Sequence, residues 1–220
     1  KKIEDVAGQR HLLGEGKVLR RIIDSGTVPN LIFYGPSGVG KTTVANIIAE
    51  NCGKSLHYLN ATTASTADIK EIISSIGGFE SENGILLYLD EIQYFNKKQQ
   101  QILLSYIETG DVTLIASTTE NPYFYVYNAI LSRSTVFEFK PLAPGDILAA
   151  AHRAIKLLSG EKGKEITISD SALDKLCRAA AGDARRCLNM LELCVLTSEG
   201  GDKIVIEDGT AEEILAANAV

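Results

Sequence analysis

The stretch Gly35-Pro-Ser-Gly-Val-Gly-Lys41-Thr42 fits the pattern G-x-x-x-x-G-K-[ST] at every required position. The apolar run Leu31–Tyr34 comes directly before it and predicts a short buried strand, and a helix is expected from Lys41 to about Asn51. A glycine turn between a strand and a helix binds phosphate, because the backbone can wrap the phosphate chain and the helix N-terminus offers unpaired N–H groups. The predicted nucleotide-binding residues of this loop are Gly35, Pro36, Ser37, Gly38, Val39, Gly40, Lys41, Thr42 and Thr43.

Two side chains at the end of this loop carry its chemistry. Lys41 is expected to reach the β- and γ-phosphates and to act on the reacting phosphate, and Thr42 to offer its hydroxyl to Mg²⁺. A chance glycine turn is the alternative, but chance gives no reason for the full pattern to fall between a strand and a helix. The sequence therefore predicts that ATP and Mg²⁺ bind here.

A second apolar run, Ile85–Leu89, ends in the two carboxylates Asp90 and Glu91. Such a run is typical of a strand buried on both faces, and carboxylates at its end are costly unless they meet a cation or protons. We predict that Asp90 holds Mg²⁺ and that Glu91 orients and polarises the attacking water. An isolated Asp-Glu pair is more often a solvated turn, but the phosphate loop favours the catalytic interpretation. An acid beside the metal ligand suits hydrolysis, so the pair favours a motor or switch over a kinase.

Strands alternate with helices as far as Lys140. Further strands are expected at Leu56–Asn60, Val112–Ala116 and Val136–Phe139. Helices are expected at Leu19–Ser25, from Ser65 through Ile76 to a stop at Gly77-Gly78, and at Lys97–Thr109. This alternation predicts a parallel sheet covered on both faces, and hence an α/β fold with a five-stranded parallel sheet in a nucleotide-binding domain of residues 1–141.

The pattern changes after the stretch Lys140-Pro-Leu-Ala-Pro144. Helices are expected at about Gly145–Leu158, Asp170–Ala181 and Asp183–Ser198, with little strand between them. Thr210-x-x-Glu213 has the form of a capping box and predicts one more helix that begins there and that the end of the chain leaves unfinished. Residues 142–220 are therefore expected to form a small helical lid domain.

Two arginines stand near predicted element ends. Arg133 lies in Leu131-Ser-Arg-Ser134, between a helical stretch and the last strand, and Arg185 lies in Gly182-Asp-Ala-Arg-Arg186, at the start of a lid helix. In isolation, either arginine is more often an exposed ion-pair partner. Their places relative to the phosphate loop favour a role in stabilising phosphate charge.

Composition limits the classes of partner. The chain has 220 residues with 28 acidic and 22 basic side chains, and the net charge of −6 argues against a general polyanion-binding surface but not against a local basic channel. No apolar run approaches the roughly 18 residues that span a bilayer, so no membrane partner is expected. The four cysteines have no metal-ligand spacing, which favours reduced core cysteines in a cytosolic protein. The chain begins with Lys1 and holds one methionine, Met190, so we expect a trimmed part of a longer protein.

Several short motifs together resemble those of AAA+ ATPases of the clamp-loader clade. These motifs are the phosphate loop, Asp90-Glu91, Thr118-Thr-Glu-Asn-Pro122, Ser132-Arg133 and Gly182-Asp-Ala-Arg-Arg186. More narrowly, Asp90-Glu91-Ile92, Phe95-Asn96-Lys97 and Thr118–Pro122 are similar to the replication-associated recombination protein A family, which includes the Werner-helicase-interacting ATPase of eukaryotes. The likeness runs from Asp5-Val-Ala-Gly-Gln9 to about Ser198.

The resemblance implies roles for residues outside the two carboxylate and loop motifs. It gives Thr118, with Thr119 beside it, a sensor role toward the γ-phosphate or the water. It makes Arg133 an arginine finger that acts in trans on the nucleotide of a neighbouring subunit. It makes Arg185 a second sensor, which reaches from the lid to the γ-phosphate of its own subunit.

The same resemblance places Val6-Ala7-Gly8 against the adenine, together with lid residues, and makes Asn60 a weaker candidate for a polar switch that holds Glu91 idle. The chain departs from the family's pattern at Gln93-Tyr94, where His-Arg is usual, and at Ser134, which replaces a cysteine. We expect neither change to touch the phosphate chemistry, although both affect positions where coupling to DNA could be altered.

The resemblance implies a cytoplasmic, nucleoid-associated ATPase that acts at replication forks or recombination intermediates and remodels or loads something on DNA. Its implied partners are forked, single-stranded or gapped DNA and replication proteins. Members of the family continue past residue 220 into a helical oligomerisation domain, so a homo-oligomer is expected of the full-length protein and a monomer of this stretch alone.

Other functions stay open at this point. A clamp-loader subunit should carry Ser-Arg-Cys and an asparagine sensor, and a branch-migration motor lacks Asn-Pro after the threonines. From another class, the chain is a module that holds ATP and assembles partners without hydrolysing it. Such modules tend to lose the lysine, the glutamate or the finger, and Lys41, Glu91 and Arg133 are all present, so the sequence favours an enzyme.

Overall fold

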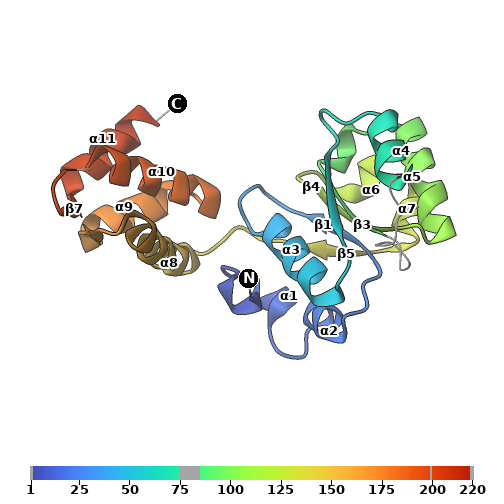
Figure 1. Ribbon diagram of the computed structural model, residues 1–220, viewed down its shortest axis with the longest axis horizontal. Coiled ribbons are helices and arrows are strands. Elements are labelled where there is room, and N and C mark those ends of the chain that lie inside the picture. The colour runs from blue at the N-terminus through green and yellow to red at the C-terminus, as the bar shows by residue number, and fades with distance from the viewer. Residues whose placement is uncertain (1, 75–84, 199, 219–220) are drawn as a thin grey trace. The chain divides into compact units, whose positions relative to one another are not determined.

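The computed structural model describes residues 2–74, 85–198 and 200–218. The chain divides into two compact units (Figure 1), of which the first comprises residues 1–35 and 41–139 and the second residues 36–40 and 140–220. In the described part of the chain, no helix has the length and apolar character needed to cross a membrane.

A five-stranded sheet forms the centre of the first unit, with the strand order β2-β3-β4-β1-β5. Its strands are β1 (Asn30–Tyr34), β2 (Leu56–Asn60), β3 (Ile85–Asp90), β4 (Val112–Thr118) and β5 (Ser134–Glu138). Every pairing is parallel, which confirms the predicted α/β fold. β4 runs beyond the predicted end at Ala116, because Ser117 and Thr118 pair with Phe33 and Tyr34 of β1.

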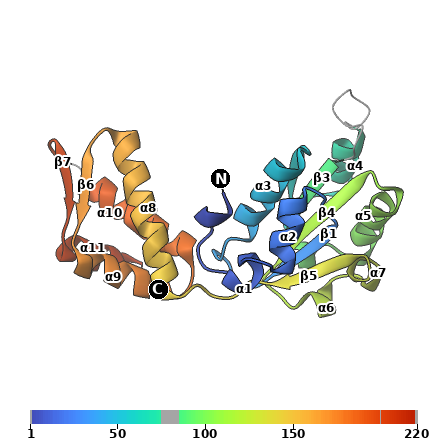
Figure 2. The ribbon, with the colours of Figure 1, turned by 90° about the horizontal axis from the view of Figure 1, so that it is seen from below.

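Helices cover both faces of this sheet (Figures 1 and 2). The described helical elements of the first unit are η1 (Ile3–Asp5), α1 (Arg10–Leu13), α2 (Val18–Ser25), α3 (Lys41–Cys52), α4 (Thr66–Ser74), η3 (Ile92–Tyr94), α5 (Lys97–Thr109), α6 (Pro122–Tyr125) and α7 (Asn128–Leu131). α2 packs against α3 on one face, whereas Ile69 of α4, Leu103 of α5 and Ile130 of α7 share a core cluster on the other. The five residues of β3 that precede Asp90 are all buried, so this apolar strand contributes core side chains to both faces of the sheet.

Local capping chemistry explains two predicted helix starts. Asn96 accepts from the backbone N–H of Gln99, and the Gln99 side chain accepts from the N–H of Asn96, so α5 begins where the sequence predicts. Asp68 accepts from the N–H and hydroxyl of Ser65 ahead of α4. The predicted continuation of α4 to Ile76 and its stop at Gly77-Gly78 lie outside the described residues.

The second unit is mostly helical, but it also contains a two-stranded parallel sheet. Its elements are α8 (Pro144–Lys162), β6 (Glu165–Ile168), α9 (Asp170–Ala179), α10 (Ala184–Thr197), β7 (Lys203–Ile206) and α11 (Asp208–Ala217). Little strand was expected between the lid helices, and the strands there are indeed short, but their pairing into a sheet was not predicted. β6 and β7 have only four residues each, and two helices separate them in the sequence. No local sequence pattern therefore predicts that they pair. Ile166, Ile204 and Ile206 are buried by that pairing.

Three thiols contribute to the core of the second unit. Cys177 on α9 and Cys187 and Cys194 on α10 are buried and free, whereas Cys52 of the first unit is half-buried and free. Burial raises the pKa of the Cys194 thiol. These cysteines are reduced, as the sequence predicts, and three of the four act as small apolar core residues.

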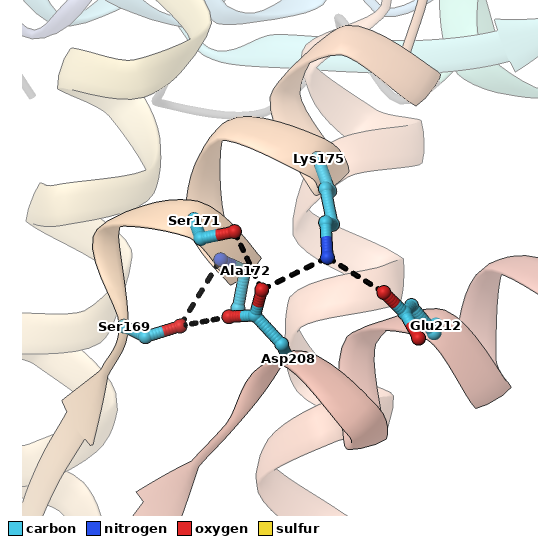
Figure 3. Close-up of polar contacts among 6 residues, drawn as sticks. All are labelled: Ser169, Ser171, Ala172, Lys175, Asp208 and Glu212. Atoms are coloured by element: carbon cyan, nitrogen blue, oxygen red, sulfur yellow. Dashed lines mark hydrogen bonds and ion pairs between the residues drawn. The ribbon is translucent and has the colours of Figure 1, made fainter.

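α11 begins at Asp208, not at Thr210 as the capping-box pattern predicted. Asp208 accepts hydrogen bonds from Ser169, the N-cap of α9, and from Ser171, and it forms an ion pair of 2.9 Å with Lys175 (Figure 3). Lys175 also pairs with Glu212 one turn further along α11, at 2.6 Å. These contacts between α9 and α11 fix the start of α11, and a pattern confined to one helix cannot reveal them.

We expect Asp208→Asn to destabilise the second unit in a pH-dependent way. The Lys175 ammonium, with the hydroxyls of Ser169 and Ser171, holds the pKa of Asp208 well below its ordinary value of 3.8. A carboxyl whose folded pKa is lowered stabilises the fold above its unfolded pKa and loses that contribution as pH falls through the lower folded value. Free energies of unfolding from urea titrations should therefore differ between wild type and Asp208→Asn at pH 7, begin to converge as pH falls below the unfolded pKa of about 4, and become equal only once pH has passed the much lower folded pKa.

The matched control is Asp174→Asn, which removes an exposed carboxylate whose ion-pair partner among the described residues is Arg178 on the same helix. Surface pairs of this kind contribute little. An Asp208→Asn variant as stable as Asp174→Asn at pH 7 would contradict the assigned role of Asp208.

Candidate active site

The predicted chemical groups of the first unit gather at the carboxyl edge of the sheet. β1, which leads into the phosphate loop, lies beside β4, and β4 lies beside β3, which ends in Asp90. Tyr34 is in register with Thr118, and the N–H of Gly35 donates to the carbonyl oxygen of Thr118 at 3.1 Å. Ligands of open parallel sheets bind at this edge. The topology thus brings together the loop start, the Asp90-Glu91 pair and the predicted sensor Thr118.

Two loop positions accept glycine only. Gly35 has φ of 142° and Gly38 has φ of 66°, which are values that favour glycine. A Cβ at Gly35 would overlap the carbonyl oxygen of Phe139, and a Cβ at Gly38 would overlap the carboxylate of Asp183. These close approaches explain the glycine positions of the loop pattern.

Residues 36–40 of the loop belong to the second unit and contact the start of α10 there. The N–H of Ala184 donates to the carbonyl oxygen of Gly38 at 3.1 Å, and the hydroxyl of Ser37 donates to the Asp183 carboxylate at 3.3 Å. Asp183 also caps α10 by accepting from the N–H of Arg186. Arg185 is exposed in the first turn of α10, directly after a residue that is bonded to the loop.

Lys41 and Thr42 begin α3 at the end of the loop. The Lys41 side chain is buried, and its ammonium donates to the carbonyl oxygen of Gly35 at 2.6 Å. The hydroxyl of Thr42 lies 3.0 Å from the hydroxyl of Tyr88 on β3. The lysine therefore reaches back across the loop, and the threonine is held by the strand that carries Asp90.

Asp90 fits the proposed magnesium site. The hydroxyl of Ser117 donates to its carboxylate, and among the described residues Asp90 has no cationic partner. The described residues also contain no cluster of three His, Cys, Asp or Glu side chains suited to a metal ion. Mg²⁺ is commonly held by one or two carboxylates together with phosphate oxygens and waters, so a half-buried carboxylate without a cation suits it.

Tyr88 links these groups from inside the sheet. Burial raises the pKa of its phenol to about 12, and hydrogen bonds to Ser117 and Thr42 oppose that rise. The phenol thus stays protonated at neutral pH and can donate to one neighbour while accepting from the other. A single hydroxyl orients both Thr42 and the serine that binds Asp90.

We expect Tyr88→Phe to weaken nucleotide binding several-fold in the presence of Mg²⁺ and to destabilise the fold by about 1 kcal/mol, because the half-buried hydroxyl of Thr42 and the buried hydroxyl of Ser117 lose a partner. Titrations of a fluorescent ATP analogue at several Mg²⁺ concentrations would measure the first effect. Tyr58→Phe is the matched control. The Tyr58 ring lies beside the Tyr88 ring, but the Tyr58 hydroxyl donates to Asn46 and its removal leaves Thr42 untouched. Equal effects of the two variants would contradict the assigned link.

Glu91 follows Asp90 in an unusual backbone conformation. Its φ of 56° and ψ of 47° are left-handed, which costs a non-glycine residue roughly 1 kcal/mol or more. Its carboxylate oxygen Oε2 accepts from the amide of Gln93 at 2.5 Å and from the hydroxyl of Thr119 at 3.4 Å. Gln93, which is expected from the sequence not to touch the phosphate chemistry, thus contacts the predicted general base directly, and its effect on that chemistry stays a prediction.

Asn60, the weaker candidate for a polar switch, has its side chain bonded within its own turn in the structure. It lies opposite Asp90 in the register of β2 and β3, but its side-chain oxygen accepts from the N–H and hydroxyl of Thr62 at 2.9 and 2.6 Å. Those bonds close a local turn after β2. The groups that hold Glu91 are Gln93 and Thr119 instead.

The remaining predicted residues lie in distinct surroundings. Thr118 is buried, and its hydroxyl accepts from the N–H of Glu120 at 3.0 Å. Arg133 is exposed and forms an ion pair of 2.7 Å with Glu108. Val6 and Ala7 are half-buried between η1 and α1, so their placement against adenine stays a prediction.

Sequence reasoning missed three residues that organise the site: Tyr88, Ser117 and Gln93. A polar ring inside the otherwise aliphatic run Ile85–Leu89 was the available signal for Tyr88. Gln93 was noticed only as a departure from a family pattern. Its contact with Glu91 depends on the left-handed turn at that residue, which spacing does not predict.

These features define a P-loop nucleotide-binding protein, and comparison with known families agrees. The model of the ATPase family associated with various cellular activities (AAA) matches residues 31–142, about half of the chain, and the AAA C-terminal domain matches residues 162–220. The chain belongs to the AAA family of ATPases.

Among curated proteins, the chain is similar to Replication-associated recombination protein A. It is 37% identical to that protein of Coxiella burnetii over 97% of this chain and 49% of the relative, and 38% identical to that of Bacillus subtilis over 97% of this chain and 51% of the relative. It is also 33% identical to ATPase WRNIP1 of Dictyostelium discoideum over 88% of this chain and 22% of the relative. The chain spans about half or less of the length of these relatives.

Solved structures show the same fold. A RuvB mutant of Thermotoga maritima superposes with a TM-score of 0.79 at 22% identity, covering 99% of this chain and 72% of that one. A second Thermotoga maritima structure, described as a RuvB Holliday junction branch migration motor, gives a TM-score of 0.72 at 20% identity and covers 98% of this chain and 73% of that one. At such identities the likeness concerns the fold alone.

Proposed function

We propose that this chain binds and hydrolyses ATP as part of a protein related to Replication-associated recombination protein A. One observation carries the proposal: Gly35, Lys41, Thr42, Asp90, Glu91 and Thr118 meet at one edge of a parallel sheet. Each of these residues is of a type suited to binding phosphate, holding Mg²⁺ or positioning the attacking water. The intact lysine and glutamate favour an ATPase over a module that only holds ATP.

In the proposed mechanism, the loop N–H groups and Lys41 bind the phosphates, and Thr42 and Asp90 hold Mg²⁺. The metal ion, when bound, neutralises charge on the β- and γ-phosphates. Glu91 orients the attacking water and takes its proton, while Thr118 contacts the γ-phosphate or the water. Arg185 acts as a sensor from the lid, and Arg133 supplies its charge to a neighbouring subunit. Val6 and Ala7 contact the adenine.

The biological setting is proposed from the relatives. Their names associate them with replication and recombination, so we propose action on forked, gapped or single-stranded DNA in the cytoplasm, near the nucleoid, as a homo-oligomer with replication proteins as partners. A net charge of −6 means that any DNA contact requires a local basic surface. Clamp loading and branch migration remain the rival roles within this fold.

The test is the ATPase rate of the full-length protein with no DNA and with single-stranded, forked and gapped DNA. We expect basal hydrolysis that rises with at least one DNA structure. A purified protein that binds ATP but releases no phosphate under any of these conditions would establish the non-hydrolysing assembly module instead. Stimulation only by four-way junctions would favour the branch-migration role.

A further inference from the structure

Two cysteines of the second unit, here called the thiol pair, have their sulfur atoms in direct contact. The Sγ atom of Cys177, in the last turn of α9, lies 3.9 Å from the Sγ atom of Cys187, in the first turn of α10. Both side chains are buried. Cys194, two turns further along α10, is a buried thiol outside the pair, and Cys52 is a half-buried thiol of the first unit. The proposed ATP chemistry uses none of these sulfurs.

The contact makes the two members of the thiol pair chemically different. A thiol that donates to a neighbouring sulfur stabilises the thiolate form of that neighbour. The hydrogen bond from Cys187 lowers the pKa of Cys177, whereas the same contact together with burial raises the pKa of Cys187. The thiolate is the nucleophilic form of cysteine. Cys177 is therefore the member that attacks an oxidant, and Cys187 is the thiol beside it.

The thiol pair brackets the turn that contacts the phosphate loop. Its members are ten residues apart, and the turn that joins α9 to α10 lies between them. Asp183 in that turn accepts from the hydroxyl of Ser37, and the N–H of Ala184 donates to the carbonyl oxygen of Gly38. A covalent bond across the pair would close this turn into a small ring.

The sulfurs are close enough to bond after a small movement. The S–S bond of a disulfide is about 2.0 Å long, so the two sulfurs must approach by about 2 Å. Protein interiors are closely packed, so the backbone at the end of α9 and the start of α10 must share a movement of this size. The contacts that Asp183 and Ala184 make with the phosphate loop then lose their present geometry.

We propose that Cys177 and Cys187 form a redox-active pair, which a hydroperoxide converts reversibly into a disulfide, and that the disulfide form binds nucleotide more weakly. The second half of this inference rests on the proposed function, in which the phosphate loop binds ATP. Disulfides of cytosolic proteins are usually transient and often sense oxidants, which suits a pair that is reduced in the resting protein.

The oxidation occurs in two steps. The Cys177 thiolate attacks one oxygen of the hydroperoxide, the O–O bond breaks, and a sulfenic acid forms while hydroxide (or an alkoxide) leaves. The Cys187 thiol then attacks that sulfur, the S–O bond breaks, and the hydroxide takes the thiol proton and leaves as water. With hydrogen peroxide, two thiols and one peroxide give one disulfide and two waters. A dithiol reductant reverses the reaction by exchange and is itself oxidised to a disulfide.

The experiment treats the full-length protein with hydrogen peroxide, which is small enough to enter through local opening of the turn. Free thiols are then alkylated, and mass spectrometry of peptides locates the disulfide. Titration with a fluorescent ATP analogue and Mg²⁺ follows before oxidation, after it, and after dithiothreitol. We expect a bond between Cys177 and Cys187, an affinity about fivefold weaker, as for the loss of roughly one hydrogen bond, and full recovery on reduction.

Alanine variants make the result specific. Cys177→Ala and Cys187→Ala should bind nucleotide as the reduced wild type does and should lose the response to peroxide. Cys194→Ala is the matched control, because it removes an equally buried thiol of α10 outside the pair and should keep the response. The wild-type peptide map and its reversal by dithiothreitol need no variant, so a variant that fails to fold leaves the test intact.

Three outcomes would contradict the inference. Free thiols at both positions after peroxide, or a disulfide that includes Cys194 or Cys52 instead, overturn the redox-active pair. A disulfide between Cys177 and Cys187 with unchanged affinity overturns the coupling to the phosphate loop. If the reduced protein does not bind the ATP analogue at all, the proposed function fails, and the peptide map still decides whether the pair is redox-active.

Discussion

Replacing Glu91 by glutamine is expected to abolish ATP hydrolysis while nucleotide binding is retained. The amide keeps the size of the carboxylate but cannot take a proton from water, and general base catalysis contributes about 10²–10⁴ in rate. The groups that bind the nucleotide and metal ion, Lys41, Thr42 and Asp90, are left in place. Single-turnover phosphate release and titration of a fluorescent ATP analogue with Mg²⁺ measure the two properties separately.

Two further variants make this result specific. Lys41→Ala should lose binding itself, because a buried ammonium facing the phosphate loop is removed. Glu120→Gln is the control, since it neutralises an exposed carboxylate close to the same edge of the sheet and should leave both properties intact. Turnover near the wild-type level in Glu91→Gln would remove Glu91 from the catalytic role.

Arg133→Ala is expected to have little effect on the rate of this 220-residue chain alone and a severe effect in the full-length oligomer. Arg133 is exposed at the end of α7, where it pairs with Glu108. An exposed pair contributes about 0–1 kcal/mol, so the guanidinium can leave Glu108 for a stronger partner. An arginine finger supplied in trans raises the rate by about 10³–10⁵, but only when a neighbouring subunit is held in place.

The measurement is a pair of ATPase assays at matched subunit concentration, with light scattering to establish the assembly state. Arg178→Ala is the control, because Arg178 is also an exposed arginine paired with one acid, Asp174. We expect the isolated chain to bind nucleotide and hydrolyse it slowly, with Arg133→Ala and Arg178→Ala alike. Hydrolysis by the monomeric chain as fast as by the oligomer would show that Arg133 is only a surface residue.

Most of the sheet was predictable because its signals are local. The run Ile85–Leu89 is apolar without interruption, and the observed strand is buried along that whole length. Helix α5 begins and ends at the predicted residues, since its caps Asn96 and Gly110 act within one turn of the chain. The phosphate loop is equally local, because its glycines are required by backbone angles that the loop itself adopts.

Local sequence patterns do not predict a strand pairing or a helix start that depends on residues far away in the chain. Pairing of β6 with β7 and the start of α11 at Asp208 both depend on contacts across more than thirty residues, from Ser169, Ser171 and Lys175 in the second case. Local sequence preferences differ little between a short strand and a loop, or between one possible helix start and another two residues away. Tertiary contacts decide between them.

The sequence by itself determined the class of fold, the phosphate loop and the identity of the two carboxylates, because these follow from residue type and short spacing. Only the tertiary structure decided which side chains act on those carboxylates. Asn60 has the right position in the strand order, yet it is bonded to Thr62, whereas Gln93 and Thr119 reach Glu91. The reason is geometric: the left-handed turn at Glu91 and the parallel neighbour β4 set the direction of a carboxylate, and residue spacing along the chain does not encode either.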